Sequence, residues 1–198
     1  MLTYVASEDW TGWWEIIVKT GKILRRITAK NGKEVILRTL RWEDLDDLIV
    51  LMNSLVDEGA EIGRNVKVTR DEEADWLGKK LASLERGEEF FLVAEADGKA
   101  IGTSGLTKKK GWWSHVGELG IIIEKSYRNV GIGTEMLEEI LAQAEKMGLK
   151  ILTLRLFSTN RTAYHLYEKL GFRETGRIPR ALYKDGKYLD EVIMTKET

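Results

Sequence analysis

The chain has 198 residues, with no cysteine, one proline and two histidines, His115 and His165. Without thiols, the protein has no disulfide, cysteine nucleophile, thiolate zinc site or iron–sulfur cluster. Lys and Arg number 31 against 32 Asp and Glu, so no overall basic surface indicates nucleic-acid binding. The histidine spacing indicates no metal site. Any catalysis therefore depends on carboxylates, hydroxyls, backbone donors or a bound cofactor.

The length and composition are those of an ordinary globular domain, with 43% hydrophobic and 32% charged residues. Apolar runs such as Leu48 to Met52 are far too short to span a membrane, and the N-terminus lacks a basic-then-apolar signal segment. We therefore expect a cytoplasmic protein without a membrane partner. Many charges and a single glutamine also suit a thermophilic, heat-adapted source.

Residues 1–32 are predicted to form a β-rich appendage, and residues 33–198 the main domain. Strand-like runs at 15–19 and 23–29 lie in the appendage, and Asn31-Gly32 is a strong hairpin signal. We interpret three tryptophans near the start as packing residues or as a homodimer surface. These are Trp10, Trp13 and Trp14.

The main domain is predicted to begin with a strand at 34–40, followed by two helices. Apolar residues at three- and four-residue steps indicate the first helix, which starts from an acidic turn with Glu43 and Asp44. The second helix begins at Thr69, whose spacing to Glu72 fits a capping box.

Three strands are predicted next. Those at 90–96 and 99–106 flank Asp97-Gly98, the clearest hairpin signal in the chain. A third strand is expected at 117–124 after a loop.

The last third of the chain is predicted to contain two helices and three strands. A helix at 132–147 precedes an apolar strand at 151–157, and a second helix follows at 161–170. Strands near 172–176 and 188–195 complete the domain. The order β-α-α-β-β-β-α-β-α-β-β describes a mixed α/β sheet with helices against its faces.

A glycine-rich turn joins the predicted strand at 117–124 to the helix at 132–147. Gly131 and Gly133 let the backbone approach a ligand closely, and the free N–H groups at a helix start favour phosphate. The dinucleotide fingerprint needs glycine where Met136 stands, and the Walker Gly-Lys-Ser/Thr is absent from the sequence. Taken alone, the segment fits an anion site or a simple tight turn.

The turn is similar to the Arg/Gln-x-x-Gly-x-Gly/Ala signature of the GCN5-related N-acetyltransferase (GNAT) superfamily, matched by Arg128, Gly131 and Gly133. Residues 160–172, NRTAYHLYEKLGF, resemble that superfamily's second characteristic motif. Both motifs lie in the right order and at the right distance. One departure is Asn129, where members often carry glycine or a basic residue.

The resemblance covers roughly residues 34–198 and implies a GNAT-like acyl-coenzyme A N-acyltransferase fold, a splayed mixed sheet with helices on both faces. It implies that acetyl-coenzyme A is the acetyl donor, its pyrophosphate on the N–H groups of 128–134 and its pantetheine arm paired with strand residues 121–123. Asn160 would hydrogen-bond the arm, and Tyr167 would reach the sulfur. The implied cofactor-binding residues are Ile121, Ile122, Ile123, Arg128, Asn129, Val130, Gly131, Ile132, Gly133, Thr134, Asn160 and Tyr167.

Acetyl transfer needs a base, because an alkylamine with a pKa of about 10.4 is almost fully protonated at pH 7. Since the chain has only two histidines, the expected base is a carboxylate. Glu118 is the first candidate, directly or through water, because the family often places an acidic residue there; an ordinary exposed strand glutamate is the alternative. Glu124 is the second candidate and also fits a surface charge at a strand end.

Tyr167 is expected to protonate or hydrogen-bond the departing thiolate, whose pKa is about 8.5. Its helical spacing from Ala163 and Leu170 also fits a core position, and Asn160 also fits a helix N-cap. Without cysteine the acetyl group is expected to pass directly to a primary amine in sequential kinetics. A non-catalytic acyl-coenzyme A-binding regulatory module is the alternative function.

Two charged segments bear on the acceptor. The acids between residues 42 and 63 fit either a wall that attracts a small cationic amine, an amino acid or a protein N-terminus, or a solvated helix face. The basic stretch 19–41 fits RNA docking or neutralisation of those acids, although nucleic acid is not the expected partner. The seven acids are Glu43, Asp44, Asp46, Asp47, Asp57, Glu58 and Glu61.

Overall fold

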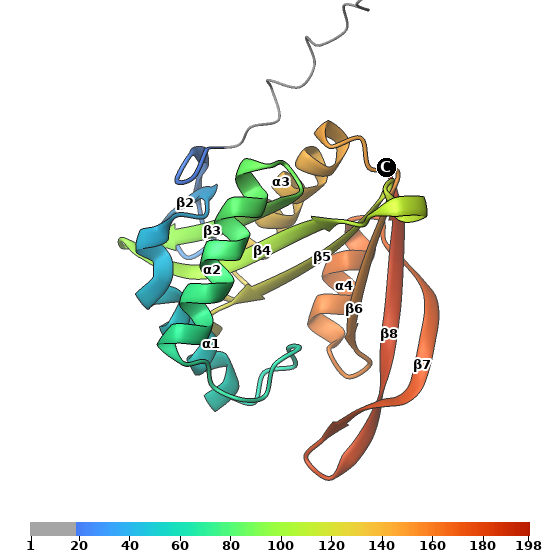
Figure 1. Ribbon diagram of the computed structural model, residues 1–198. Coiled ribbons are helices and arrows are strands. Elements are labelled where there is room, and N and C mark those ends of the chain that lie inside the picture. Colours follow the sequence, from blue (N-terminus) through green and yellow to red (C-terminus); the bar gives the residue numbers. More distant parts are fainter. Residues whose placement is uncertain (1–18) are drawn as a thin grey trace, which may run out of the picture.

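The computed structural model describes residues 19–198, which form one eight-stranded sheet with helices on both faces (Figure 1). The strand order is β1-β2-β3-β4-β5-β6-β8-β7. Neighbouring strands are antiparallel except β5 and β6, which are parallel. The mixed α/β fold class is therefore confirmed. The three tryptophans of the predicted appendage and residues 15–18 of its first strand-like run lie outside the described residues.

The bounds agree with the sequence predictions within a few residues, apart from the C-terminal hairpin. The strands are β1 (Ile23–Thr28), β2 (Glu34–Thr39), β3 (Glu89–Ala96), β4 (Lys99–Lys108), β5 (Val116–Ile123), β6 (Ile151–Phe157), β7 (Arg173–Lys184) and β8 (Lys187–Glu197). The α-helices are α1 (Leu45–Asp57), α2 (Arg70–Glu85), α3 (Ile132–Lys146) and α4 (Arg161–Lys169). Short 3-10 turns are η1 (Trp42–Asp44), η2 (Gly111–Trp113) and η3 (Lys125–Tyr127).

Turn and cap chemistry sets several of these bounds. Asn31-Gly32 closes the β1–β2 hairpin, with Gly32 at φ +82° and Ala29 N–H donating to Lys33 O at 2.8 Å. Thr69 caps α2 as predicted, because its hydroxyl accepts from Glu72 N–H while its own N–H donates to the Glu72 carboxylate. Strand β1 thus extends the same sheet, and a domain boundary at residue 32 stays a prediction.

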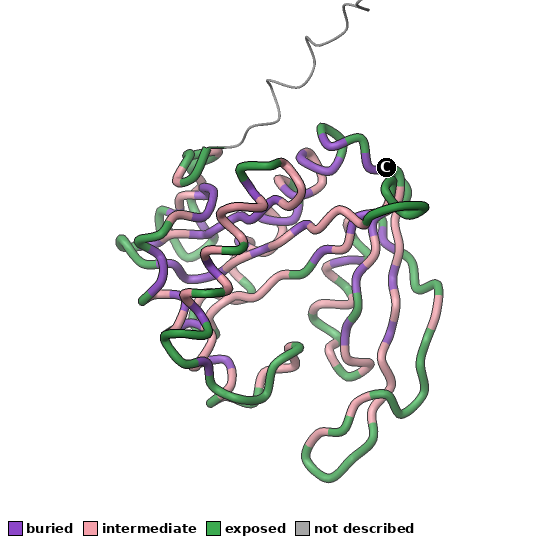
Figure 2. Tube along the Cα trace, viewed as in Figure 1, coloured by how far each residue is buried: buried purple, intermediate pink, exposed green. Residues whose placement is uncertain are grey.

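Alternating apolar residues on the strands make two cores, one on each face of the sheet. Figure 2 shows buried stretches along the central strands and on the helices that cover them. The α3 face buries Leu92 against Met136 and Ile140 of α3. The opposite face buries Phe91 and Val93 against α1 and α2. Because side chains alternate across a strand, adjacent residues of β3 serve different cores. Within residues 19–198, no helix is both long and apolar enough to cross a membrane.

The C-terminal hairpin is longer than the predicted strands at 172–176 and 188–195. Strands β7 and β8 continue to a tight turn at Asp185-Gly186, where both residues have positive φ. The register shifts between Ile178 and Leu182, in the segment that holds Pro179. Proline cannot donate to a strand ladder, and the polar, exposed residues around it hide the strand from a hydrophobicity pattern.

Strands β5 and β6 pair over only three positions, from Val116↔Ile151 to Glu118↔Thr153, and then separate. At the paired end Gly117 allows close packing, because a Cβ there would lie 2.7 Å from a methyl of Leu149. In Figure 1 the two strands diverge from this end toward their C-terminal ends. The splayed sheet that the sequence motifs imply is therefore present.

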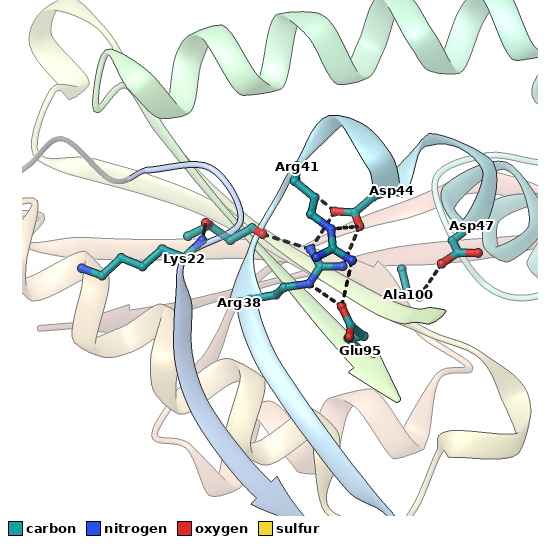
Figure 3. A network of polar contacts seen from close by, with 8 residues as sticks. Lys22, Arg38, Arg41, Asp44, Asp47, Glu95 and Ala100 are labelled. Atoms are coloured by element: carbon teal, nitrogen blue, oxygen red, sulfur yellow. Dashed lines mark hydrogen bonds and ion pairs between the residues drawn. The ribbon is translucent and has the colours of Figure 1, made fainter. Parts of the chain in front are cut away.

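A buried charge network joins β2, β3 and the start of α1 (Figure 3). The Arg38 guanidinium donates to both oxygens of Asp44, at 2.6 and 2.8 Å, and to Glu95 at 2.7 Å. The side chains of Arg38 and Asp44 are only 3% and 1% exposed. Arg41 N–H also donates to Asp44, at 3.0 Å. Asp44, expected as a first-turn helix acid, lies in η1 and acts instead as the buried partner of Arg38.

Asp44→Asn is expected to lower the free energy of unfolding by about 3 kcal/mol, because it leaves the Arg38 charge buried without its carboxylate. The matched control is Asp46→Asn, which removes a surface ion pair with Arg70 and should cost less than about 1 kcal/mol. Urea denaturation of both variants measures these changes. Equal decreases in the free energy of unfolding would contradict a larger contribution from the buried network.

Candidate active site

The gap between β5 and β6 exposes backbone hydrogen-bonding groups. Glu124 N–H donates to Ile101 O and Lys109 N–H to Val116 O, each at 2.9 Å. These two bonds show which residues of β5 direct their backbone groups toward β4. Antiparallel ladders alternate, so the backbone groups of Ile121 and Ile123 point away from β4 into the gap, whereas those of Ile122 face β4. Arg128 Nε–H donates a hydrogen bond to Ile123 O at 2.8 Å, so this carbonyl is already paired. A strand-like ligand would therefore find open groups mainly at Ile121 and at Ile123 N–H.

The turn after β5 presents a row of unpaired N–H donors. Asn129 and Gly131 adopt left-handed conformations, with φ of +62° and +94°. The N–H groups of residues 129–133 have no hydrogen-bond acceptor within the described chain. By contrast, Arg128 N–H donates to Lys125 O, and Thr134 N–H donates to Gly131 O. Such a row at the start of α3, with the helix dipole behind it, favours a phosphate.

Gly133 brings the start of α3 against its neighbours. A Cβ at this position would lie 3.3 Å from Leu166 Cδ2 and 3.4 Å from Ile123 Cδ1. The Arg128 side chain crosses the turn and forms an ion pair with Glu58 at the end of α1. Arg128, the first residue of the motif, therefore also links the turn to the end of α1.

A groove of about 870 Å³ follows the gap and the turn. Its lining combines the residues of the N–H-rich turn with the open edge of β5, so the residues present fit the phosphates and the amide-containing arm of coenzyme A. The α1–α2 connection closes it on one side and α4 on the other. Its lining includes Leu55, Glu58, Ile121, Ile122, Ile123, Arg128, Asn129, Gly131, Gly133, Thr134, Asn160, Thr162, Ala163 and Leu166.

Helix α4 places Asn160 and Tyr167 differently. Asn160 lines the groove and caps the helix, since its side-chain oxygen accepts from Ala163 N–H at 3.1 Å; its NH₂ group has no partner within the described chain. Tyr167 is buried in the α3-side core with its ring 5.8 Å from that of Phe172. Burial raises the pKa of Tyr167 to about 12. Tyr167 does not line the groove itself.

Glu118 is the last β5 residue paired with β6. Alternation with buried Leu119 places it on the α1–α2 face, where its side chain is 44% exposed and lies 3.1 Å from Lys109 Nζ. Two residues further on the same face, Gly120 opens onto empty space. Glu124 instead accepts from Ser126 Oγ at 2.7 Å at the strand end. Neither Glu118 nor Glu124 belongs to the groove lining.

The acidic segment is largely occupied by internal contacts. Asp57 pairs with Lys67 and Glu58 with Arg128, and Glu61 accepts a hydrogen bond from Thr159. Asp47 accepts from Ala100 N–H at 2.9 Å. Together with the Arg38–Asp44 pair, these contacts favour a structural role for the acids over an open anionic wall.

Sequence reasoning missed a second pocket, of about 440 Å³, beside the groove. The α1–α2 connection and the β7–β8 hairpin form it, and both cavities share Gly59, Ala60, Ile62 and Lys184. Arg64 adds a second cation to its lining. The only available signal was Asp185-Gly186, a hairpin pair that brings Lys184 to the site.

Family comparison agrees with this geometry. The model of the "Acetyltransferase (GNAT) family" matches residues 51–172, well over half of the chain. The chain belongs to this family and is an acetyl-coenzyme A-dependent N-acetyltransferase.

Individual relatives cover nearly the whole described fold. The chain is 28% identical over 171 residues to an N-alpha-acetyltransferase of Sulfurisphaera tokodaii, covering 80% of this chain and 92% of the relative. It is 24% identical over 161 residues to the L-amino acid N-acyltransferase MnaT of Escherichia coli, covering 80% and 91%. A GNAT-family acetyltransferase structure from Streptococcus pneumoniae superposes with a TM-score of 0.74 at 29% identity, covering 83% and 99%.

Gly131→Ala is expected to weaken coenzyme A binding about tenfold, because the left-handed backbone strains an alanine and shifts the N–H row. Gly148→Ala is the matched control, since Gly148 also has positive φ but lies at the far end of α3 with open space around it. Calorimetric titration with coenzyme A measures both dissociation constants. The same affinity for the two variants would contradict a role of the turn in binding.

Proposed function

We propose that the protein acetylates the α-amine of a small acceptor that carries a carboxylate, an amino acid or a close analogue. The observation that supports this most is the pair of cations, Arg64 and Lys184, in the pocket beside the cofactor groove. A carboxylate bound there would leave the α-amine a few bonds away, on the side of the groove that would hold the cofactor.

The pocket's size and charge support this class of acceptor. A volume of about 440 Å³ fits a small molecule. Among residues 19–198, the acidic partner of Arg64 is Glu72 at a long 3.7 Å, so the Arg64 guanidinium can take a carboxylate. Lys184 Nζ donates at 2.9 Å to Asp185, which also lines the pocket, so Arg64 is the main ligand expected for the carboxylate. With the acidic segment already paired, attraction of a polycation has less support.

The chain's own residues would act on the acceptor amine, the cofactor arm and the departing sulfur. The cofactor supplies an acetyl group activated as a thioester. Glu118 would take the proton from the acceptor amine, directly or through water, and Asn160 would hold the cofactor arm with its free NH₂ group. No covalent enzyme intermediate is needed, so the expected kinetic mechanism is sequential and both substrates bind before any product leaves.

Tyr167 lies outside the groove lining, so its proposed role at the departing sulfur rests on the family motif; that role would be as a hydrogen-bond donor. Its pKa of about 12 keeps the hydroxyl protonated at neutral pH. A thiol has a pKa of about 8.5, so complete proton transfer from this phenol to the thiolate is uphill. A hydrogen bond still stabilises the negative charge that develops on sulfur, and solvent can deliver the proton later.

The names of the relatives support acceptors with an α-amine. One relative is an L-amino acid N-acyltransferase and another an N-alpha-acetyltransferase. A peptide N-terminus shares this amine but places its carboxylate further away, so peptides form a separate arm of the test.

An acceptor panel should show faster acetylation of amino acids than of the matching amines without the carboxylate, measured as thiol release from acetyl-coenzyme A. Arg64→Met should raise KM for the amino acid about tenfold and leave the decarboxylated amine unaffected. Lys67→Met is the control, because Lys67 lies in the same connection but pairs with Asp57.

Preference for the decarboxylated amines, or an unchanged KM in Arg64→Met, would refute the carboxylate assignment. Preference for a short peptide over its first amino acid would point to protein N-termini instead. Coenzyme A binding without turnover on any amino acid of the panel would also refute this acceptor class.

Glu118→Gln is expected to lower kcat at least about a hundredfold at neutral pH, because the amide cannot accept the amine proton. The loss should shrink as the pH rises past the pKa of the acceptor amine, since the neutral amine then needs no base. Glu124→Gln should keep normal activity as the matched control. A Glu118→Gln enzyme with full activity at pH 7 removes Glu118 from the mechanism.

A further inference from the structure

The β1–β2 hairpin reaches the phosphate turn. Lys30 N–H donates to Val130 O at 2.9 Å. A methyl group on Gly131 would lie 3.7 Å from Lys30 Cγ and Cε, so the lysine side chain runs along the start of α3. Lys30 also belongs to the lining of the 870 Å³ groove. A lysine from outside the family match at 51–172 therefore lies beside the row of free N–H donors.

Other contacts hold the hairpin in this position. Lys33 Nζ donates to Asp97 at 3.2 Å and to Tyr127 Oη at 3.1 Å, and it lies 4.7 Å from the centre of the Tyr127 ring. Arg25 on β1 pairs with Glu135 of α3 at 2.8 Å. The hairpin is thus bound to both the turn and the helix that carry the anion site.

Lys30 differs from its neighbours Arg25 and Lys33 in having no carboxylate within ion-pair distance among residues 19–198. Its backbone is fixed while its exposed ammonium group is available. An ammonium on a flexible stem is a common phosphate ligand. The energetic advantage is that the hairpin has already restricted the lysine's position before the ligand arrives.

We propose that Lys30 binds a phosphate of coenzyme A and that the turn of the β1–β2 hairpin supplies this lysine. The phosphate is either the pyrophosphate on the turn or the 3′-phosphate of the nucleotide. The proposal concerns the cofactor side alone and holds whichever amine is the acceptor.

The test is equilibrium binding of coenzyme A and of dephospho-coenzyme A to the full chain, at low and high salt. Lys30→Met should weaken coenzyme A binding about fivefold to tenfold at low salt and reduce the salt dependence of the dissociation constant. Lys30→Glu should weaken it further. Lys22→Met is the control, because Lys22 precedes β1 at the end away from the turn and is equally exposed.

Loss of the Lys30→Met effect with dephospho-coenzyme A assigns the contact to the 3′-phosphate, and persistence assigns it to the pyrophosphate. An unchanged dissociation constant for coenzyme A in Lys30→Met and Lys30→Glu overturns the proposal. A thermal midpoint equal to that of Lys22→Met shows that the exposed substitution has not disturbed the fold.

Discussion

The parallel pairing of β5 with β6 stops after three positions, and the site depends on where it stops. Up to Glu118 the backbone groups of the two strands hydrogen-bond to each other. Beyond it, the backbone N–H and C=O groups of Ile121 and Ile123 point into the gap. Unpaired backbone groups favour a ligand that can add to the strand edge. The same separation leaves room for the start of α3, where residues 129–133 present their free N–H groups.

Two sets of contacts support this arrangement from the flanks. The Arg38–Asp44–Glu95 network joins β2, β3 and the start of α1. At the other end of α1, Glu58 pairs with Arg128 of the phosphate turn. Helix α1 thereby links the sheet to the wall of the groove, while the β1–β2 hairpin contacts the phosphate turn through Lys30.

Local signals allowed most of the fold to be predicted from the sequence. The apolar run of β6, the Thr69 cap and the Asp97-Gly98 turn each specify their element with nearby residues. The role of Asp44 was not predictable this way, because its partner Arg38 lies on another element and ion pairing depends on tertiary structure. The second pocket likewise joins Arg64 to Lys184, which are distant in sequence. Glu118 and Tyr167 stay predictions as catalytic residues.

The gap and the turn together form one continuous backbone site that would hold acetyl-coenzyme A. Amide hydrogen exchange, followed residue by residue with and without coenzyme A, tests it most directly. The account predicts slower exchange on binding at Ile121, at Ile123 and across residues 129–133, with little change at Ile122, which already pairs with β4. Protection confined to other parts of the chain, or equal at Ile121 and Ile122, would contradict it.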